Sequence, residues 1–219
     1  MNPRTRKVVV PGPVGRIDCA LDLPAVAPRG VAVIAHPHPL FGGTRDNKVV
    51  QTMARALLAL GYVCWRPNFR GVGASEGEHD EGEGELEDLL AVTEYALADA
   101  SAPTSPELVL AGFSFGSFVQ SHAVQRLTES GRPVTRAIMV GTAVSRWPVA
   151  PLPPSTLVIH GENDDVVPLA DVLDWARPLA QPVTVVPGAD HFFHRKLTVL
   201  KNLVVLAWGR VDLLTAGAS

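Results

Sequence analysis

The chain has 219 residues, of which 47% are hydrophobic and 19% charged, and its formal net charge is −3. This length and composition can bury one substantial core, so we expect a single domain over residues 1–219. The lack of a basic stripe excludes a nucleic-acid partner, and no apolar run reaches the roughly eighteen residues of a membrane span. The start has too few apolar residues for a signal peptide, and Cys19 and Cys64 lie in apolar runs typical of buried thiols. We therefore expect a reduced, cytoplasmic protein.

Strands and helices alternate along the whole chain. In chain order, strands are predicted at residues 7–10, 16–23, 31–35, 62–65, 108–111, 136–140, 156–159 and 183–186. Helices are predicted at residues 47–60, 89–97, 117–124, 169–179 and 196–208. The strand at 16–23 alternates polar and apolar residues, which is typical of a half-exposed antiparallel strand. The whole pattern predicts an α/β fold with a mostly parallel central sheet and helices on both faces.

An acidic stretch precedes the second predicted helix. Residues 76–88 hold eight acids interleaved with glycine. They lack the regular Asp-x-Asp-x-Asp-Gly spacing of a calcium loop. We expect a solvated loop here, whose last acids lie favourably at the N-terminus of the helix.

A Gly-x-Ser-x-Gly motif, Gly112-Phe-Ser-Phe-Gly116, separates the buried strand at 108–111 from the helix that follows. Glycine on either side of a sharp turn lets the neighbouring backbone approach where a Cβ would clash. Such a turn raises the Ser114 hydroxyl above the edge of the sheet and points the first N–H groups of the helix toward it. Ser114 is therefore the candidate nucleophile.

A serine hydroxyl needs a base to accept its proton and a third group to orient that base. The strand at 156–159 leads to Asp164, and the strand at 183–186 leads to His191. The carboxyl ends of parallel strands share one edge of a sheet, so we expect both side chains near Ser114. The chain order serine, aspartate, histidine is the order of an acyl-transfer triad on this kind of sheet.

The chain resembles the α/β-hydrolase superfamily, and within it a group of small, cap-less bacterial serine hydrolases of the esterase type. Six segments carry the resemblance: 36–39 (His-Pro-His-Pro), 67–73, 112–116, 160–168 (His-Gly-x-x-Asp-x-x-Val-Pro), 188–191 and 190–196. The resemblance implies an α/β-hydrolase fold, with Ser114 as nucleophile, Asp164 as acid and His191 as base. Residues 144–154 leave no room for the cap domain that other members insert there.

The acid and the base each have neighbours that could take their place. Their competitors are Glu162, Asp165 and Asp190 for the acid, and His194 for the base. Spacing from Gly161 favours Asp164, and closeness to the strand end favours His191. We expect His160 to be a packed or hydrogen-bonded histidine beneath the acid loop.

An oxyanion hole needs backbone N–H donors aimed at the tetrahedral intermediate. Phe115, which follows the candidate nucleophile, supplies one. The loop after the third strand should supply the other, but Pro37 and Pro39 have no N–H group. This leaves His38 as the preferred donor, with Leu40 as the alternative.

The pair His36 and His38 could instead be zinc ligands of a metal-dependent hydrolase. Such enzymes need a complete eightfold barrel and further ligands, for which 219 residues are few. We therefore expect no metal and no cofactor.

The expected function is that of a carboxylesterase-like serine hydrolase, which cleaves small carboxylic esters through an acyl-enzyme. Acyl-thioesterase, peptidase or amidase activity with the same triad is an alternative, and so is a catalytically silent binding module. The expected partner is a small-molecule ester; the oligomeric state stays open. We expect an open cleft that favours short acyl groups, although several of its residues could equally be core. The expected cleft residues are Leu40, Phe41, Trp147, Phe192 and Phe193.

Overall fold

The computed structural model describes residues 5–215, and side chains as far as residue 208; residues 1–4 and 216–219 of the expected domain lie outside this part. The eight strands of this part form one sheet in the order β1-β2-β4-β3-β5-β6-β7-β8. They are β1 (Arg6–Gly12), β2 (Gly15–Asp22), β3 (Gly30–Ala35), β4 (Tyr62–Pro67), β5 (Glu107–Phe113), β6 (Arg136–Val140), β7 (Leu157–Gly161) and β8 (Val183–Val186). Strands β3 to β8 are parallel, whereas β2 is antiparallel to both β1 and β4.

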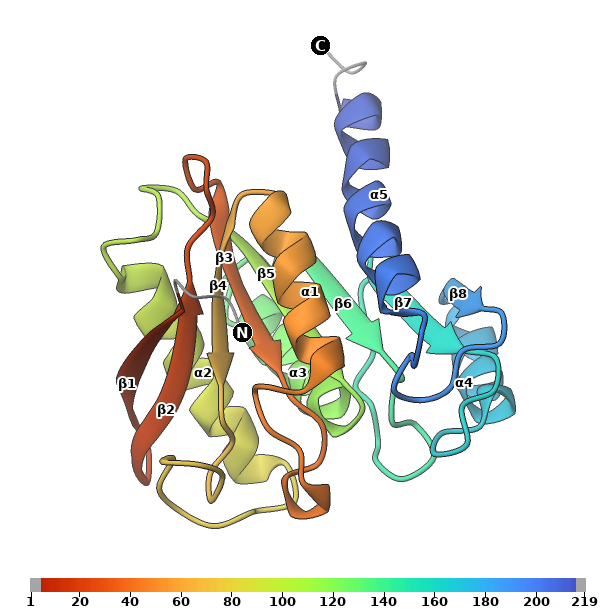
Figure 1. Ribbon diagram of the computed structural model, residues 1–219, viewed down its shortest axis with the longest axis horizontal. Coiled ribbons are helices and arrows are strands. Elements are labelled where there is room, and N and C mark those ends of the chain that lie inside the picture. Colours follow the sequence, from red (N-terminus) through yellow and green to blue (C-terminus); the bar gives the residue numbers. More distant parts are fainter. Residues whose placement is uncertain (1–4, 216–219) are drawn as a thin grey trace.

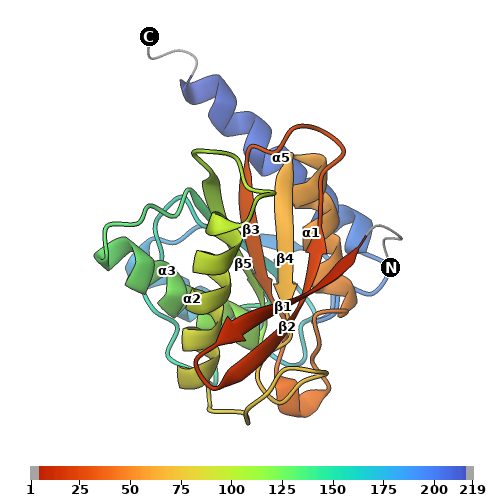
Figure 2. The same ribbon diagram turned by 90° about the vertical axis from the view of Figure 1, so that its left-hand side faces the viewer.

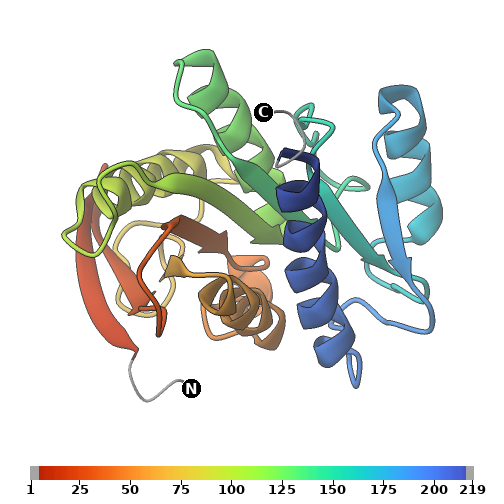
Figure 3. The ribbon, with the colours of Figure 1, turned by 90° about the horizontal axis from the view of Figure 1, so that it is seen from above.

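Helices cover both faces of this sheet. The helices are α1 (Lys48–Ala59), α2 (Glu83–Ala98), α3 (Phe115–Glu129), α4 (Leu169–Ala176) and α5 (Leu197–Thr215), with short 3-10 turns η1 (Pro39–Phe41) and η2 (Arg177–Leu179). Helices α2, α3 and α4 lie on one face, and α1 and α5 lie on the other (Figures 2 and 3). This arrangement confirms the predicted α/β fold. Within residues 5–215, no helix is both long enough and apolar enough to cross a bilayer.

The hydrophobic core lies in two layers, one on each side of the sheet. Successive side chains of a strand point to opposite faces, and β5 supplies both layers in this way. Leu108 and Leu110 pack with α2 and α3, while Val109, Ala111 and Phe113 pack with α1 and α5. Burial on both faces explains why the central strands are continuous apolar runs. Because these strands are parallel, their carboxyl ends share one edge of the sheet, at the lower side of Figure 1.

The prediction that residues 76–88 form a loop is wrong in its second half, because α2 already begins at Glu83. The fully buried Glu85 carboxylate accepts hydrogen bonds from the Gly82 and Asp80 N–H groups, at 2.8 and 3.0 Å. These bonds satisfy donors that a helix start leaves unpaired. The acids and glycine of residues 83–88 are therefore part of the helix start, whereas residues 76–82 precede it.

Candidate active site

Ser114 occupies a strained turn between β5 and α3. Its φ of 54° and ψ of −122° lie in a region that side chains rarely adopt. Its N–H donates to the Val140 carbonyl of the neighbouring strand at 2.9 Å, which holds the turn in place. A Cβ at Gly112 would lie 2.3 Å from the Gly116 carbonyl oxygen, and one at Gly116 would lie 2.5 Å from the His36 oxygen. Both glycines of the motif are thus required by close backbone packing.

Three side chains from three strand ends form one chain of hydrogen bonds. The Ser114 Oγ lies 3.0 Å from His191 Nε2, and His191 Nδ1 lies 2.7 Å from Asp164 Oδ2. All three residues are largely buried, with at most 7% of their surface exposed. Since the carboxylate can only accept, Nδ1 carries the ring proton and Nε2 is free to accept the hydroxyl proton. The arrangement can therefore withdraw a proton from Ser114.

The Asp164 carboxylate is kept ionised. Burial alone would raise its pKa, but the hydrogen bond and charge of His191 and the Val167 N–H outweigh burial and lower the pKa. The other carboxylate oxygen accepts from the Val166 and Val167 N–H groups at 3.0 and 2.8 Å. Beneath it, the buried His160 donates from Nε2 to the Val167 carbonyl at 2.9 Å. Burial lowers the pKa of His160, so this ring stays neutral.

The competing base and two of the three competing acids have partners of their own. His194 pairs with Asp190 at 2.7 Å, and the imidazole is 69% exposed. Glu162 accepts the Gly188 N–H at 2.8 Å, and Asp165 is exposed. Of the four acids considered, the structure brings only Asp164 into hydrogen-bond contact with His191.

The loop after β3, residues 36–47, is called the β3 loop below. His36 is fully buried in it; its Nδ1 donates to the Pro37 carbonyl at 2.6 Å and its Nε2 accepts from the Phe69 N–H at 2.9 Å. Burial lowers the pKa of His36 to about 4, so the ring is neutral. The Pro37–His38 peptide is trans, so a carbonyl held toward His36 points the His38 N–H the opposite way.

The structure separates the two candidate loop donors. The Leu40 N–H is occupied by His38 Nδ1 at 3.2 Å. The His38 N–H donates to no other group among residues 5–215. The Phe115 N–H belongs to the first turn of α3, where helices leave N–H groups without an intrahelical acceptor. Of the N–H groups expected to form an oxyanion hole, those of His38 and Phe115 therefore remain available, whereas that of Leu40 is occupied.

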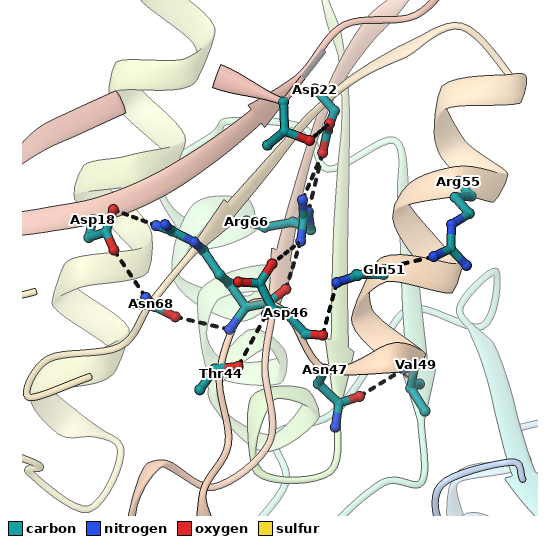
Figure 4. Close-up of polar contacts among 12 residues, drawn as sticks. Asp18, Asp22, Thr44, Asp46, Asn47, Val49, Gln51, Arg55, Arg66 and Asn68 are labelled. Carbon is teal, nitrogen blue, oxygen red and sulfur yellow. Dashed lines mark hydrogen bonds and ion pairs between the residues drawn. The ribbon is translucent and has the colours of Figure 1, made fainter. Parts of the chain in front are cut away.

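A buried ion network ties the β3 loop to the antiparallel edge of the sheet (Figure 4). Arg66 of β4 lies 2.9 Å from Asp22 of β2 and donates to the Arg45 carbonyl at 2.8 Å. Arg45 in turn contacts Asp18 at 2.5 Å, and its N–H donates to Asn68 at 2.9 Å. The β3 loop is thus anchored by side chains from β2 and β4.

Both ring nitrogens of His36 form hydrogen bonds, so that neither has a free lone pair for a metal. In the part of the chain whose side chains are described, no three His, Cys, Asp or Glu residues are grouped to hold a metal ion.

Sequence reasoning did not single out His79. Its ring centroid lies 4.8 Å from that of His38 and 5.5 Å from that of Phe115. Its Nδ1 is 2.8 Å from the buried Glu85 carboxylate. A histidine inside an acidic run, followed by a glutamate at the start of a helix, is the signal that could have found it.

The expected cleft residues lie in two different settings. Leu40, Phe41 and Phe192 are exposed by 69, 75 and 42%. Phe192 contacts the His191 ring edge-on at 5.1 Å. Trp147 is half-buried and packs on Phe115 and on the His38 ring. The expectation for Phe193 is wrong, because this side chain is fully buried in the core.

Proteins of known structure share this fold and much of this sequence. A lid-less α/β serine hydrolase from Xanthomonas campestris is 40% identical over 96% of both chains, with a TM-score of 0.84. An α/β serine hydrolase homologue from Coxiella burnetii is 36% identical over 91% of this chain and 95% of its own, with a TM-score of 0.80. The chain belongs to the α/β-hydrolase superfamily.

A curated relative from Rickettsia prowazekii is 32% identical in an alignment of 195 residues, which covers 84% of this chain and 81% of the relative. No family model matches the chain. The similarity to the Xanthomonas protein agrees with the short connection between β6 and β7, which holds no cap domain.

Proposed function

We propose that this protein is a serine hydrolase that cleaves small carboxylic esters through an acyl-enzyme. The observation that carries the proposal is the hydrogen-bonded chain of Ser114, His191 and Asp164, with separations of 3.0 and 2.7 Å. A hydroxyl held by a neutral imidazole, itself oriented by an ionised carboxylate, is an activated nucleophile.

In the proposed mechanism, Ser114 Oγ attacks the ester carbonyl while His191 Nε2 accepts its proton. Asp164 stabilises the resulting imidazolium, and the His38 and Phe115 N–H groups bind the oxyanion. The imidazolium then protonates the leaving alcohol. Water attacks the acyl-enzyme by the same route and releases the acid. These steps need no metal or cofactor.

The surroundings of the site favour short acyl groups. Leu40, Phe41 and Phe192 are exposed apolar side chains on the loops around Ser114, and the β6–β7 connection holds no cap to enclose a long chain. An open apolar cleft of this kind gives a long lipid tail little additional buried surface. We therefore expect p-nitrophenyl acetate and butyrate to be cleaved faster than the palmitate, and a clear preference for palmitate would contradict an open cleft.

Labelling with a fluorophosphonate probe tests the nucleophile directly. Covalent attachment to a Ser114-containing peptide is expected, and the Ser114→Ala variant should remain unlabelled. The matched control is Ser117→Ala. The Ser117 hydroxyl donates to the Ser114 carbonyl at 2.6 Å, and its removal should leave labelling intact. An unlabelled native protein would indicate a silent binding module instead.

A substrate panel separates the remaining acyl-transfer activities. Thioesters and peptides of the same acyl group present the same carbonyl to the same triad. If a thioester or peptide has the higher kcat/KM, the ester assignment gives way to an acyl-thioesterase or a peptidase.

A further inference from the structure

A cavity of about 630 Å³ lies at the start of α2, outside the hydrogen-bonded chain of the active site. It is called the acidic-aromatic pocket below. Its lining includes three acids, Asp80, Glu81 and Glu83, and three aromatic rings, those of Phe118, His122 and Trp147. Leu86 and Pro148 complete its apolar surface.

The aromatic wall of the pocket continues to the active site. The Phe118 and Trp147 rings are stacked, with centroids 6.0 Å apart and an angle of 21° between their planes. Trp147 also contacts the Phe115 ring at 5.2 Å and the His38 ring at 5.3 Å. Phe115 follows Ser114 directly, so a single layer of rings joins the pocket to the proposed oxyanion donors.

The charge of the pocket has one sign. Three carboxylates line it, and no lysine or arginine does. Arg70, which forms an ion pair with one of these acids, is bound by both oxygens of the buried Asp88 at 2.9 Å and reaches Asp80 only at 3.7 Å. The pocket therefore keeps a net negative potential beside an aromatic wall.

The acids are held in place by a rigid turn. Glu85 binds the Asp80 and Gly82 N–H groups, and Glu81 has a φ of 51°, which a side chain adopts at a cost. A Cβ at Gly82 would lie 2.5 Å from the Phe118 ring, so the turn packs directly on the aromatic wall. The attraction between a carboxylate and a helix N-terminus accounts for the presence of Glu83. It does not account for Asp80 and Glu81, which precede the helix.

We propose that the acidic-aromatic pocket binds the cationic end of the substrate, an ammonium group carried on a short apolar chain. Aromatic faces and carboxylates both attract an organic cation, and the apolar walls accept the carbon chain. This inference deepens the proposed function, on which it rests. A neutral or anionic group of the same size would lack both attractions.

Binding is measured first with the Ser114→Ala variant, so that the result does not depend on turnover. Benzyltrimethylammonium, benzyl alcohol and phenylacetate share an aromatic body and differ in charge. The cation should bind about tenfold more tightly than the other two by NMR titration, and added salt should reduce this preference. Equal binding of benzyl alcohol, or tighter binding of phenylacetate at the start of α2, would overturn the proposal.

Variants locate the binding site. Glu81→Gln and Trp147→Leu, each combined with Ser114→Ala, should each weaken the cation several-fold, and both changes together should abolish its preference. Glu94→Gln is the matched control: it makes the same charge change on α2, about 16 Å along the helix from Glu83, and should leave binding unchanged. If the cation binds the two combined variants as tightly as it binds the Ser114→Ala protein, then it is bound elsewhere.

Kinetics of the native protein link the pocket to the reaction. The p-nitrophenyl ester of 4-(trimethylammonio)butyrate should have a KM about tenfold below that of its neutral carbon isostere, the 5,5-dimethylhexanoate. Equal KM values with rapid hydrolysis of both esters would refute the pocket and leave the proposed function standing. Cation binding without hydrolysis of either ester would refute the proposed function and leave the pocket standing.

Discussion

The two flanks of Ser114 are built in different ways. On the acid–base flank, Asp164 is held by the N–H groups of Val166 and Val167, two and three residues along the same loop. On the oxyanion flank, the β3 loop is held by Arg66 and Asp22, which are 44 residues apart in the chain and meet across the sheet (Figure 4). One flank is local in sequence, whereas the other depends on the antiparallel edge of the sheet.

This difference predicts how the two flanks respond to mutation. A side chain that acts on the acid–base flank can be removed while its loop keeps its own backbone bonds. On the oxyanion flank, the buried groups that stabilise the fold are also those that would position the proposed donor. We therefore expect changes there to alter stability and turnover together, and the predictions below test that contrast.

The largest effect is expected on the acid–base flank. Ser114→Ala should lower kcat for p-nitrophenyl butyrate by about a millionfold, and Asp164→Asn by about ten-thousandfold, because each disables the proton transfer. Urea unfolding should show folded proteins in both cases, and Ser117→Ala should retain activity. A Ser114→Ala protein that keeps most of its esterase activity would contradict the proposed mechanism.

On the oxyanion flank, Arg66→Met should lower the free energy of unfolding by about 3–5 kcal/mol, because it removes the buried guanidinium that lies 2.9 Å from the buried Asp22 carboxylate. Turnover should fall with it, since the β3 loop loses the bond to the Arg45 carbonyl. Arg16→Met is the control: its side chain is 70% exposed beside Glu76, and the change should cost less than about 1 kcal/mol. Equal losses in urea unfolding of the two variants would remove the distinction between the flanks.

The pH dependence of stability should report the buried His36. The folded protein holds its pKa at about 4, below the ordinary 6.5, so the unfolded chain binds more protons between these values. Its contribution is fully present above about pH 6.5 and is lost as the pH falls toward 4, by about 3 kcal/mol in all. Burial lowers the pKa values of His38 and His160 as well, which adds to the loss in the same direction.

The His36→Asn variant isolates this contribution. In urea unfolding measured across the same pH range, its stability should change less steeply than that of the native protein. Parallel pH profiles of the two proteins would show that His36 does not titrate in this way.

The smallest of these effects concerns the direction of the His38 N–H. His36→Phe removes the donor to the Pro37 carbonyl, and we expect kcat to fall about a hundredfold with little change in KM, as for a lost oxyanion donor. His36→Asn restores an N–H near the Nδ1 position and should recover most of the loss. If the two variants have the same kcat, the ring acts only as a packing residue.

The contrast between the flanks also explains what could be predicted from the sequence. The strand, turn and helix around Ser114 follow from an apolar run and two glycines that close packing requires. Asp164 and His191 follow parallel strands, whose ends share one edge. The ion pair of Arg66 and Asp22 could not be predicted in this way. A charged residue in a strand is expected to be exposed unless its distant partner is known. His79 and the early start of α2 depend likewise on the burial of Glu85, which is a tertiary event.

The backbone of Ser114 carries a further consequence for the evolution of this protein. A φ of 54° on a residue with a Cβ stores roughly 1–3 kcal/mol, whereas glycine at that position costs about 0.5–1 kcal/mol in chain entropy. Replacement of Ser114 by glycine should therefore stabilise the fold and at the same time abolish the proposed activity. Selection for heat resistance alone would favour that replacement, so only a continuing demand for turnover preserves the serine.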